Sequence, residues 1–411
     1  MNKTRTILFV AWAACSMHAM AQRLTLDECL AMAYENNPQL RSELKNIEKN
    51  QLLIGTAFDA PNTEIELSQD ATSGGSMENG VTFSQEFDFP TLYIAKRKVL
   101  KTDYLVAKDY YHVQKNELCG NIVSTYHSLL FVKHKVKALE RLSANYATFA
   151  RIAHARFEAG ESSRLETMNA DRLCAKSDVE LRNAKAEWKS LCLRLMSLTG
   201  SEEWIEPADD ALPVLDTQEV TDELLPALTY KGKWLESELL RSQQSLGMAK
   251  QEFMPGLFVA ATTQLLIKDF NPYHIERPRF EQGNFMGFQV GITIPLFFGA
   301  KRARLLAAKR DVEMAKLRIE DANLQMKQAY ADAQNEFQAA AENLRYYEER
   351  GLQQANEMAR LAQVSYELGD IDYMEYMQNV ETASALHIEY LESIERYNQS
   401  IIKLQTIKGI L

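Results

Sequence analysis

Beyond its first 21 residues, this 411-residue sequence contains no long apolar segment. No stretch there approaches the roughly 18 consecutive apolar residues that a membrane-spanning helix needs, so any passage through a membrane would have to use β-strands. Basic clusters are also absent, and the formal net charge is −10. The composition therefore argues against nucleic-acid binding, which depends on clustered lysine and arginine.

Cysteine is scarce and shows no pairing pattern. Of five cysteines, four follow residue 21 without any C-x-x-C spacing: Cys29, Cys119, Cys174 and Cys192. We expect these to be buried positions on helices and not a disulfide framework. The motifs G-x-S-x-G and H-E-x-x-H and a phosphate-binding glycine loop are absent as well. His127 and His134, seven residues apart on a predicted helix, are too far apart to hold one ion without other ligands. We therefore expect no enzyme, no cofactor and no metal site.

Residues 1–21 have the pattern of a cleaved secretory signal peptide. Two basic residues precede an apolar run ending at Cys15, and Ala19-Met20-Ala21 supplies a small-x-small cleavage site. Cys15 raises the alternative of a lipoprotein, but Trp12 stands where a lipobox would have leucine. We expect export, with cleavage after Ala21.

The sequence that follows contains an internal repeat. Residues 22–199 and residues 222–411 each predict a short helix, a β-hairpin, a very long helix, a glycine turn and a returning helix. Matching residues recur in the same order, such as Lys96-Arg97 and Lys301-Arg302 after the two hairpins. Such repetition favours duplicated units that bury their surfaces by stacking. An acidic, proline-containing connector at 200–221 is expected to lie against the outside of the helices.

The predicted hairpins, 62–89 and 257–297, alternate apolar and polar residues. In the first, Ile65 and Leu67 alternate with glutamate and serine; in the second, Phe288 and Val290 alternate with glycine and glutamine. This alternation is typical of transmembrane barrel strands. It is equally typical of a soluble antiparallel sheet that covers a core, so the strands by themselves leave both alternatives open.

The helices favour the membrane alternative. Segments 91–157 and 301–366 contain no proline and little glycine; at 1.5 Å per residue each would extend roughly 90–100 Å, longer than any globular core. Helices 162–199 and 371–408 would return beside them. A heptad seam runs through the second long helix, with alanine three residues after its first four members: Leu305, Val312, Ile319, Met326, Ala333 and Ala340, with Ala308, Ala315, Ala322 and Ala329. Leu317 and Leu324 lie off this seam, which predicts a second neighbour.

Four strands cannot close a barrel, and lipid does not tolerate unpaired strand edges. The pattern therefore predicts an oligomer, and strand number alone permits two, three or four copies. Several motifs then resemble the TolC family of outer-membrane efflux proteins, over essentially the whole chain after residue 21. They are Leu24-Thr25-Leu26-Asp27-Glu28 with Asn36-Asn37-Pro38, the basic pair after each hairpin, Ile294-Pro295-Leu296-Phe297 with Gly299, and two aromatic-x-x-Gly turns.

This resemblance implies a mixed α and β fold in a homotrimer. Four strands per chain would contribute to a 12-stranded outer-membrane β-barrel, and long antiparallel coiled-coil helices would form a periplasmic α-barrel. The protein would then lie in the outer membrane of a Gram-negative-type cell and meet a periplasmic adaptor protein and an inner-membrane efflux pump. The chain also resembles the heavy-metal or cation efflux branch of the family.

The resemblance also assigns candidate site residues. In the family, aromatic-x-x-Gly turns lie at the periplasmic tips and meet the adaptor; Phe157 to Gly160 and Tyr366 to Gly369 match them here. Glu166 and Glu375 match an acid six positions past each glycine, and Gln378 replaces a second family acid. The two glutamates could line a constriction at the tips, or could be ordinary first-turn acids favoured by the helix dipole.

We therefore expect a passive exit duct for small molecules or cations that opens by outward movement of the helices around 371–408. The alternative is a non-transporting envelope scaffold built on the same coiled coils. Four methionines close to the tips, Met168, Met358, Met374 and Met377, are consistent with a soft-metal route, but helix packing is the simpler explanation.

Overall fold

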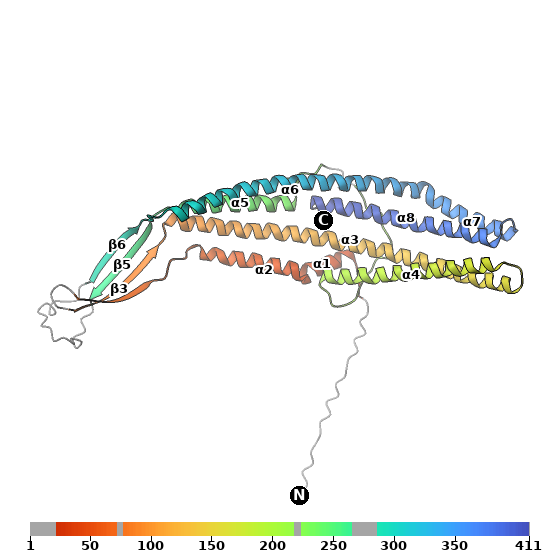
Figure 1. The fold of residues 1–411 in the computed structure, drawn as a ribbon, viewed down its shortest axis with the longest axis horizontal. Coiled ribbons are helices and arrows are strands. Elements are labelled where there is room, and N and C mark those ends of the chain that lie inside the picture. The colour runs from red at the N-terminus through yellow and green to blue at the C-terminus, as the bar shows by residue number, and fades with distance from the viewer. Residues whose placement is uncertain (1–21, 72–76, 218–222, 265–285, 411) are drawn as a thin grey trace, which may run out of the picture.

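The computed structural model describes residues 22–71, 77–217, 223–264 and 286–410. It is a long, narrow molecule, with a small sheet at one end and two helical hairpin tips at the other (Figure 1). The predicted signal peptide lies outside the described residues. Within the described residues, no helix combines the length and apolar character needed to cross a bilayer.

The first half contains four helices. A capping box between Thr25 and Glu28 starts α1 (Leu26–Asn36), and the side chain of Asn37 caps α2 (Pro38–Leu53). A 3₁₀ turn at Ile54–Ala57 follows α2. The long helix α3 (Pro90–Glu158) is continuous over 69 residues, and α4 (Arg164–Thr199) returns beside it.

The second half differs from its predicted form within its long helix. Its helices are α5 (Tyr230–Gln251), α6 (Gly299–Tyr346), α7 (Leu352–Leu368) and α8 (Tyr373–Lys408). The range predicted as a long helix, 301–366, is helical throughout, but a π-helical turn at Tyr347–Gly351 separates α6 from α7. Proline is absent from this position, and Gly351 is the one local signal in the turn; a single glycine is tolerated inside many helices, so it does not by itself predict a π-helical turn.

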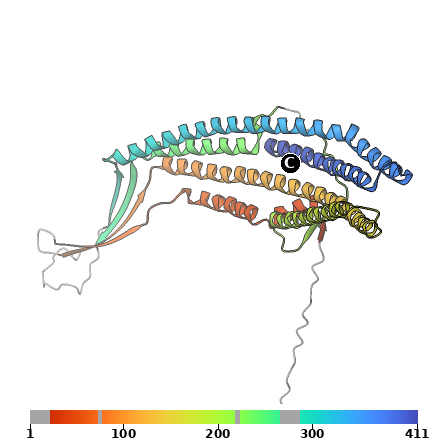
Figure 2. The same ribbon diagram turned by 45° about the vertical axis from the view of Figure 1, so that its right-hand side comes forward.

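The short helices lie end to end beside the long ones. Figures 1 and 2 show α2 and α4 following one another along α3, and α5 and α8 following one another along α6. The two halves meet where α3 contacts both α5 and α8. The structure is therefore a layer of long helices with shorter helices stacked end to end beside them.

The first three members of the predicted heptad seam of α6, Leu305, Val312 and Ile319, are half-buried, and Met326 is buried. Ala308, Ala315, Ala322, Ala333 and Ala340 are all buried. Ala329 is exposed instead, and its neighbour Tyr330 is buried, which corrects the prediction for that position. An α-helix drifts by about 20° per heptad relative to a strict seven-residue repeat, so the buried stripe moves by one residue after three heptads.

One antiparallel sheet contains the four long strands, β2 (Glu64–Ala71), β3 (Met77–Phe87), β5 (Gly256–Gln264) and β6 (Met286–Thr293), in the order β2-β3-β5-β6. The register places Ile65, Phe83, Ala261 and Phe288 side by side on one face. The next row, Glu66, Thr82, Thr262 and Gly287, lies on the other face. The sheet therefore has an apolar and a polar face, as the alternation predicted.

The connector folds back onto the helices through contacts that the sequence did not predict. Residues Ile205–Pro207 form β4, which pairs in parallel with β1 (Gln22–Leu24). Further along, the Asn398 side chain of α8 donates to the Pro213 carbonyl (2.7 Å) and accepts from the Leu215 N–H (3.0 Å). The connector therefore lies against both halves of the helical layer.

Four hydrophobic clusters lie between the helices of the described residues, and three of them are large; the smallest joins Cys119 and Val123 of α3 to Ile402 of α8. One lies around α1 and the middle of α3, and includes the buried Cys29 and Cys192. A second, which we call the equatorial core, joins α6 to α8 through Met326, Tyr330 and Ile401. The third, which we call the tip core, joins α3, α4 and the start of α8. The thiols of Cys29, Cys119, Cys174 and Cys192 are free, and all but the half-buried Cys174 are buried.

Candidate functional site at the helical tips

The two aromatic-x-x-Gly turns have the same backbone geometry. Gly160 and Gly369 both have φ of +77°, a left-handed conformation that favours glycine. The N–H after each glycine closes the turn on a carbonyl five residues back, from Glu161 to Arg156 (2.8 Å) and from Asp370 to Ser365 (2.9 Å). Figure 1 shows both turns at the end of the molecule opposite the sheet.

Phe157 and Tyr366 therefore occupy equivalent positions, three residues before the two glycines. Phe157 is 43% exposed, whereas Tyr366 packs against other tyrosines, with its ring centroid 5.0 Å from that of Tyr376. The two turns thus have equivalent backbones, but their aromatic side chains differ in what they contact.

The two candidate glutamates also occupy equivalent helical positions. The Ser163 hydroxyl accepts from the Glu166 N–H (3.3 Å), and the Asp372 carboxylate accepts from the Glu375 N–H (2.8 Å). Each glutamate is the third residue of its helix, where the helix dipole favours a negative charge.

The two glutamates differ in their surroundings. The Glu166 side chain is only 15% exposed, and its Oε1 lies 3.5 Å from Nη1 of Arg156 at the end of α3. Glu375 is exposed, as is Gln378 about one turn further along α8. Within one chain, Glu166 is thus part of an ion pair that joins two helices, while Glu375 faces solvent.

An aromatic cluster holds the two helical hairpins together close to the tips. Phe149 of α3 and Tyr373 of α8 lie with ring centroids 4.8 Å apart, and Tyr366 lies 5.3 Å from Tyr373. Phe149 is fully buried and Tyr373 is 6% exposed. Burial raises the pKa of Tyr373 to about 12, with smaller contributions from Tyr366 and Tyr376.

Sequence reasoning did not identify Phe149, Tyr373 or Arg156. The available signals were the seven-residue spacing between Tyr366 and Tyr373 and the position of Arg156 directly before Phe157. Neither signal specifies a partner, because each partner lies on another helix.

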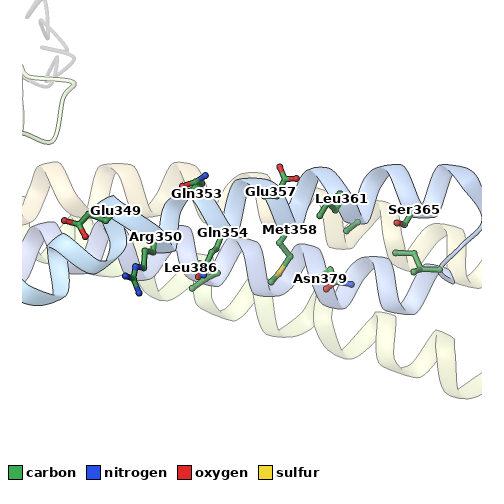
Figure 3. Close-up of a pocket in the computed structure, with 12 residues that line it drawn as sticks. Glu349, Arg350, Gln353, Gln354, Glu357, Met358, Leu361, Ser365, Asn379 and Leu386 are labelled. Atoms are coloured by element: carbon green, nitrogen blue, oxygen red, sulfur yellow. The ribbon is translucent and has the colours of Figure 1, made fainter.

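The methionines close to the tips have different surroundings. Met377 is buried in the tip core and Met374 packs against it. Met358 lines a groove between α7 and α8, and Met168 is exposed. This groove has a volume of about 890 Å³; Figure 3 shows Arg350, Glu357 and Leu361 along it. The described residues contain no group of three or more His, Cys, Asp or Glu residues that could hold a metal ion.

The fold matches that of solved outer-membrane channels. The chain superimposes on a crystal structure of CusC with a TM-score of 0.74 at 17% identity, covering 94% of this chain and 92% of that one. The Campylobacter jejuni CmeC outer membrane channel gives 0.72 at 15% identity, covering 93% and 85%. VceC of Vibrio cholerae gives 0.73 at 15% identity, covering 93% and 96%. These similarities establish the shared fold.

Sequence comparison establishes the family. The outer membrane efflux protein family model matches residues 29–201 and 235–409, and the chain therefore belongs to that family. It is also 20% identical over 391 residues to the cobalt-zinc-cadmium resistance protein CzcC of Cupriavidus metallidurans, covering 94% of this chain and 90% of the relative.

The family match confirms the resemblance to the TolC family and the predicted location in the outer membrane, with a large helical part in the periplasm. Members of the family are the outer-membrane channels of tripartite efflux systems, which also contain an adaptor and a pump. The protein is accordingly an efflux channel and not an enzyme.

Proposed function

We propose that three copies of this chain form a closed exit duct that conducts cations supplied by an inner-membrane pump through an adaptor. The observation that carries this proposal is the open sheet. In the single chain β2 and β6 are edge strands without an outer partner, and unpaired edges are costly in lipid. Pairing β6 of one copy with β2 of the next would close a twelve-stranded barrel.

The apolar face of the sheet supports a position in the membrane. Leu67, Phe288 and Val290 are each more than 70% exposed in the single chain. Bacterial barrels of this type turn such a face toward lipid and the alternate, polar face toward the lumen.

The outer surface of α6 supports contact between copies. Leu317 and Leu324 are 63% and 65% exposed, off the buried seam. Leucines at seven-residue spacing on a long helix are typical of a second coiled-coil contact. A neighbouring copy would cover them.

At the periplasmic end, the proposed constriction includes Glu375 and Gln378 from each copy, with Glu166 held at its edge by Arg156. The turns at Phe157 to Gly160 and Tyr366 to Gly369 are the proposed adaptor contacts. Opening would separate α7 and α8 from α3 and α4 at the aromatic cluster, which joins the two hairpins close to the turns.

Cations are the proposed cargo class, and two observations support this. The relative CzcC is named for resistance to cobalt, zinc and cadmium. The register also places Glu64, Glu66 and Glu86 on the polar face of the sheet, and all three are exposed. No lysine, arginine or histidine occurs in the four strands of this sheet as described. A lumen with this lining would attract cations.

Purified protein tests the duct directly. We expect a trimer by native mass spectrometry in detergent and discrete conductance in a planar bilayer once the tips are loosened. A monomer, or a trimer that never conducts, would instead indicate the envelope scaffold. For the cargo, a deletion strain should become sensitive to cobalt, zinc or cadmium; sensitivity to dyes and antibiotics alone would contradict cation export.

A further inference from the structure

The π-helical turn at Tyr347–Gly351 changes the hydrogen bonding of the second long helix. The Leu352 N–H donates to the Tyr347 carbonyl, five residues back, where a regular helix would use the residue four back. The turn therefore holds one residue more than a regular turn. Such turns bend helices and occur often at functional positions. Figure 1 shows that the helix changes direction between α6 and α7.

The side chains of Tyr347 and Glu389 stabilise this turn in its observed form. Gly351 is buried, and a Cβ added there would lie 2.8 Å from Cδ1 of Tyr347, so the tyrosine ring occupies the space that a side chain would need. The Tyr347 hydroxyl donates to Oε2 of Glu389 on α8 (3.1 Å). A larger residue at 351 would therefore require the Tyr347 ring to move, and the Tyr347 hydroxyl connects the turn to the neighbouring helix.

The turn lies between two hydrophobic cores. On α8, Tyr373 and Met377 belong to the tip core, and Ile401 and Leu404 belong to the equatorial core. Between these groups no residue from 384 to 392 is buried. Grooves of about 300 and 890 Å³ flank the turn, one bordered by Tyr347 and the other by Arg350. On its α8 side the hairpin is therefore thinly packed where the π-helical turn occurs, while Leu344, Gly351 and Ala355 on the other helix are buried.

Because the π-helical turn and the thinly packed part of α8 lie beside each other, bending the hairpin here should cost little free energy. A segment with few buried apolar contacts opens at low free energy compared with the cores on either side.

We propose that the π-helical turn at Tyr347–Gly351 is the hinge about which α7 and the first part of α8 move when the periplasmic end opens. This inference rests on the proposed duct function and adds the position of the moving joint. Residues on the tip side of the turn would swing, and residues beyond the equatorial core would stay in place.

Deleting Glu349 tests the hinge. This residue is exposed, and its removal takes out the extra residue, so α6 and α7 become one regular helix with the helical phase kept on both sides. The matched control, Glu349→Ala, removes the same side chain but keeps the π-helical turn. Both changes are made in a Tyr373→Leu background, in which the aromatic cluster is loosened. We expect the deletion, and not the control, to lower the frequency of channel opening by about tenfold or more. Equal opening in both variants would overturn the hinge.

Hydrogen exchange on the unmodified trimer gives a second, independent test. We expect the amides of residues 348–352 to exchange faster than those of 340–346 and 353–359 in the same helix. Protection equal to that of both flanks would contradict the hinge even if the deletion variant failed to fold. If no Tyr373→Leu channel conducts at all, the duct proposal fails, while hydrogen exchange still decides whether the joint exists.

Discussion

Phe149 of α3 and Tyr373 of α8 pack ring against ring, with centroids 4.8 Å apart, and so join the two helical hairpins of the chain close to their tips. Both rings are buried. Because the partners belong to different hairpins, this contact must break if one hairpin moves away from the other.

Weakening this contact should favour the open channel. Tyr373→Leu keeps an apolar side chain but removes the aromatic pair, worth about 0.5–1.5 kcal/mol. We expect openings in a planar bilayer to become roughly fivefold more frequent for each kcal/mol lost. Tyr373→Phe keeps the ring and should behave like the unmodified protein. Equal opening in the Leu and Phe variants would show that the aromatic pair does not hold the tips closed.

The two tip glutamates should contribute unequally to ion selectivity. Glu375 is exposed, whereas Glu166 is paired with Arg156. Glu375→Gln should therefore reduce cation selectivity, measured as a shift of reversal potential in a salt gradient, and Glu166→Gln should shift it less. A Glu375→Gln channel with unaltered selectivity would remove this residue from the constriction.

A buried carboxylate between α3 and α8 predicts a pH-dependent stability. Glu395 Oε1 accepts from the Ser128 hydroxyl (2.6 Å) and from Nε2 of Gln399 (2.9 Å), while Oε2 is buried without a partner. Burial raises the pKa of Glu395 above its ordinary value of 4.5; the two hydrogen bonds oppose the rise, and the charge of Glu187 adds to it.

A raised folded-state pKa means that the protonated form of Glu395 favours folding, and that this contribution is lost as the pH rises through the folded pKa. Glu395→Gln, which imitates the protonated form, should therefore raise the melting temperature at pH 7. The gain should shrink as the pH falls toward 4.5. Thermal unfolding of both proteins between pH 4 and 8 measures this, and a gain independent of pH would show that charge burial is not its cause.

Asn398 should control how firmly the connector is held. Its side chain is fully buried and makes two hydrogen bonds to the backbone of Pro213 and Leu215. Asn398→Ala leaves both backbone groups without partners, which should cost about 1–3 kcal/mol. We expect faster proteolytic cleavage in the connector and a lower melting temperature. Asn50→Ala, which removes a local bond to Asn46 within α2, is the control; equal cleavage in both variants would contradict the role of Asn398.

Much of the fold could be predicted because its signals are local. The alternation around Ile65 and Phe288 predicted the two faces of the sheet, and glycines at 160 and 369 predicted the two helical turns. The seam of α6 followed from its heptads, except at Ala329, where the helical period departs from seven. The family resemblance was carried by motifs in order along the chain and was confirmed by the family match.

The sequence by itself determined helix length, strand alternation, turn position and the requirement for partners, because each depends on residues close together in the chain. Only the tertiary structure decided the π-helical turn at Tyr347–Gly351, the pairing of β1 with β4, the contact of Phe149 with Tyr373 and the different surroundings of Glu166 and Glu375. Each of these depends on a neighbour from another element or on the space between packed helices. No local pattern specifies which distant side chain will fill that space.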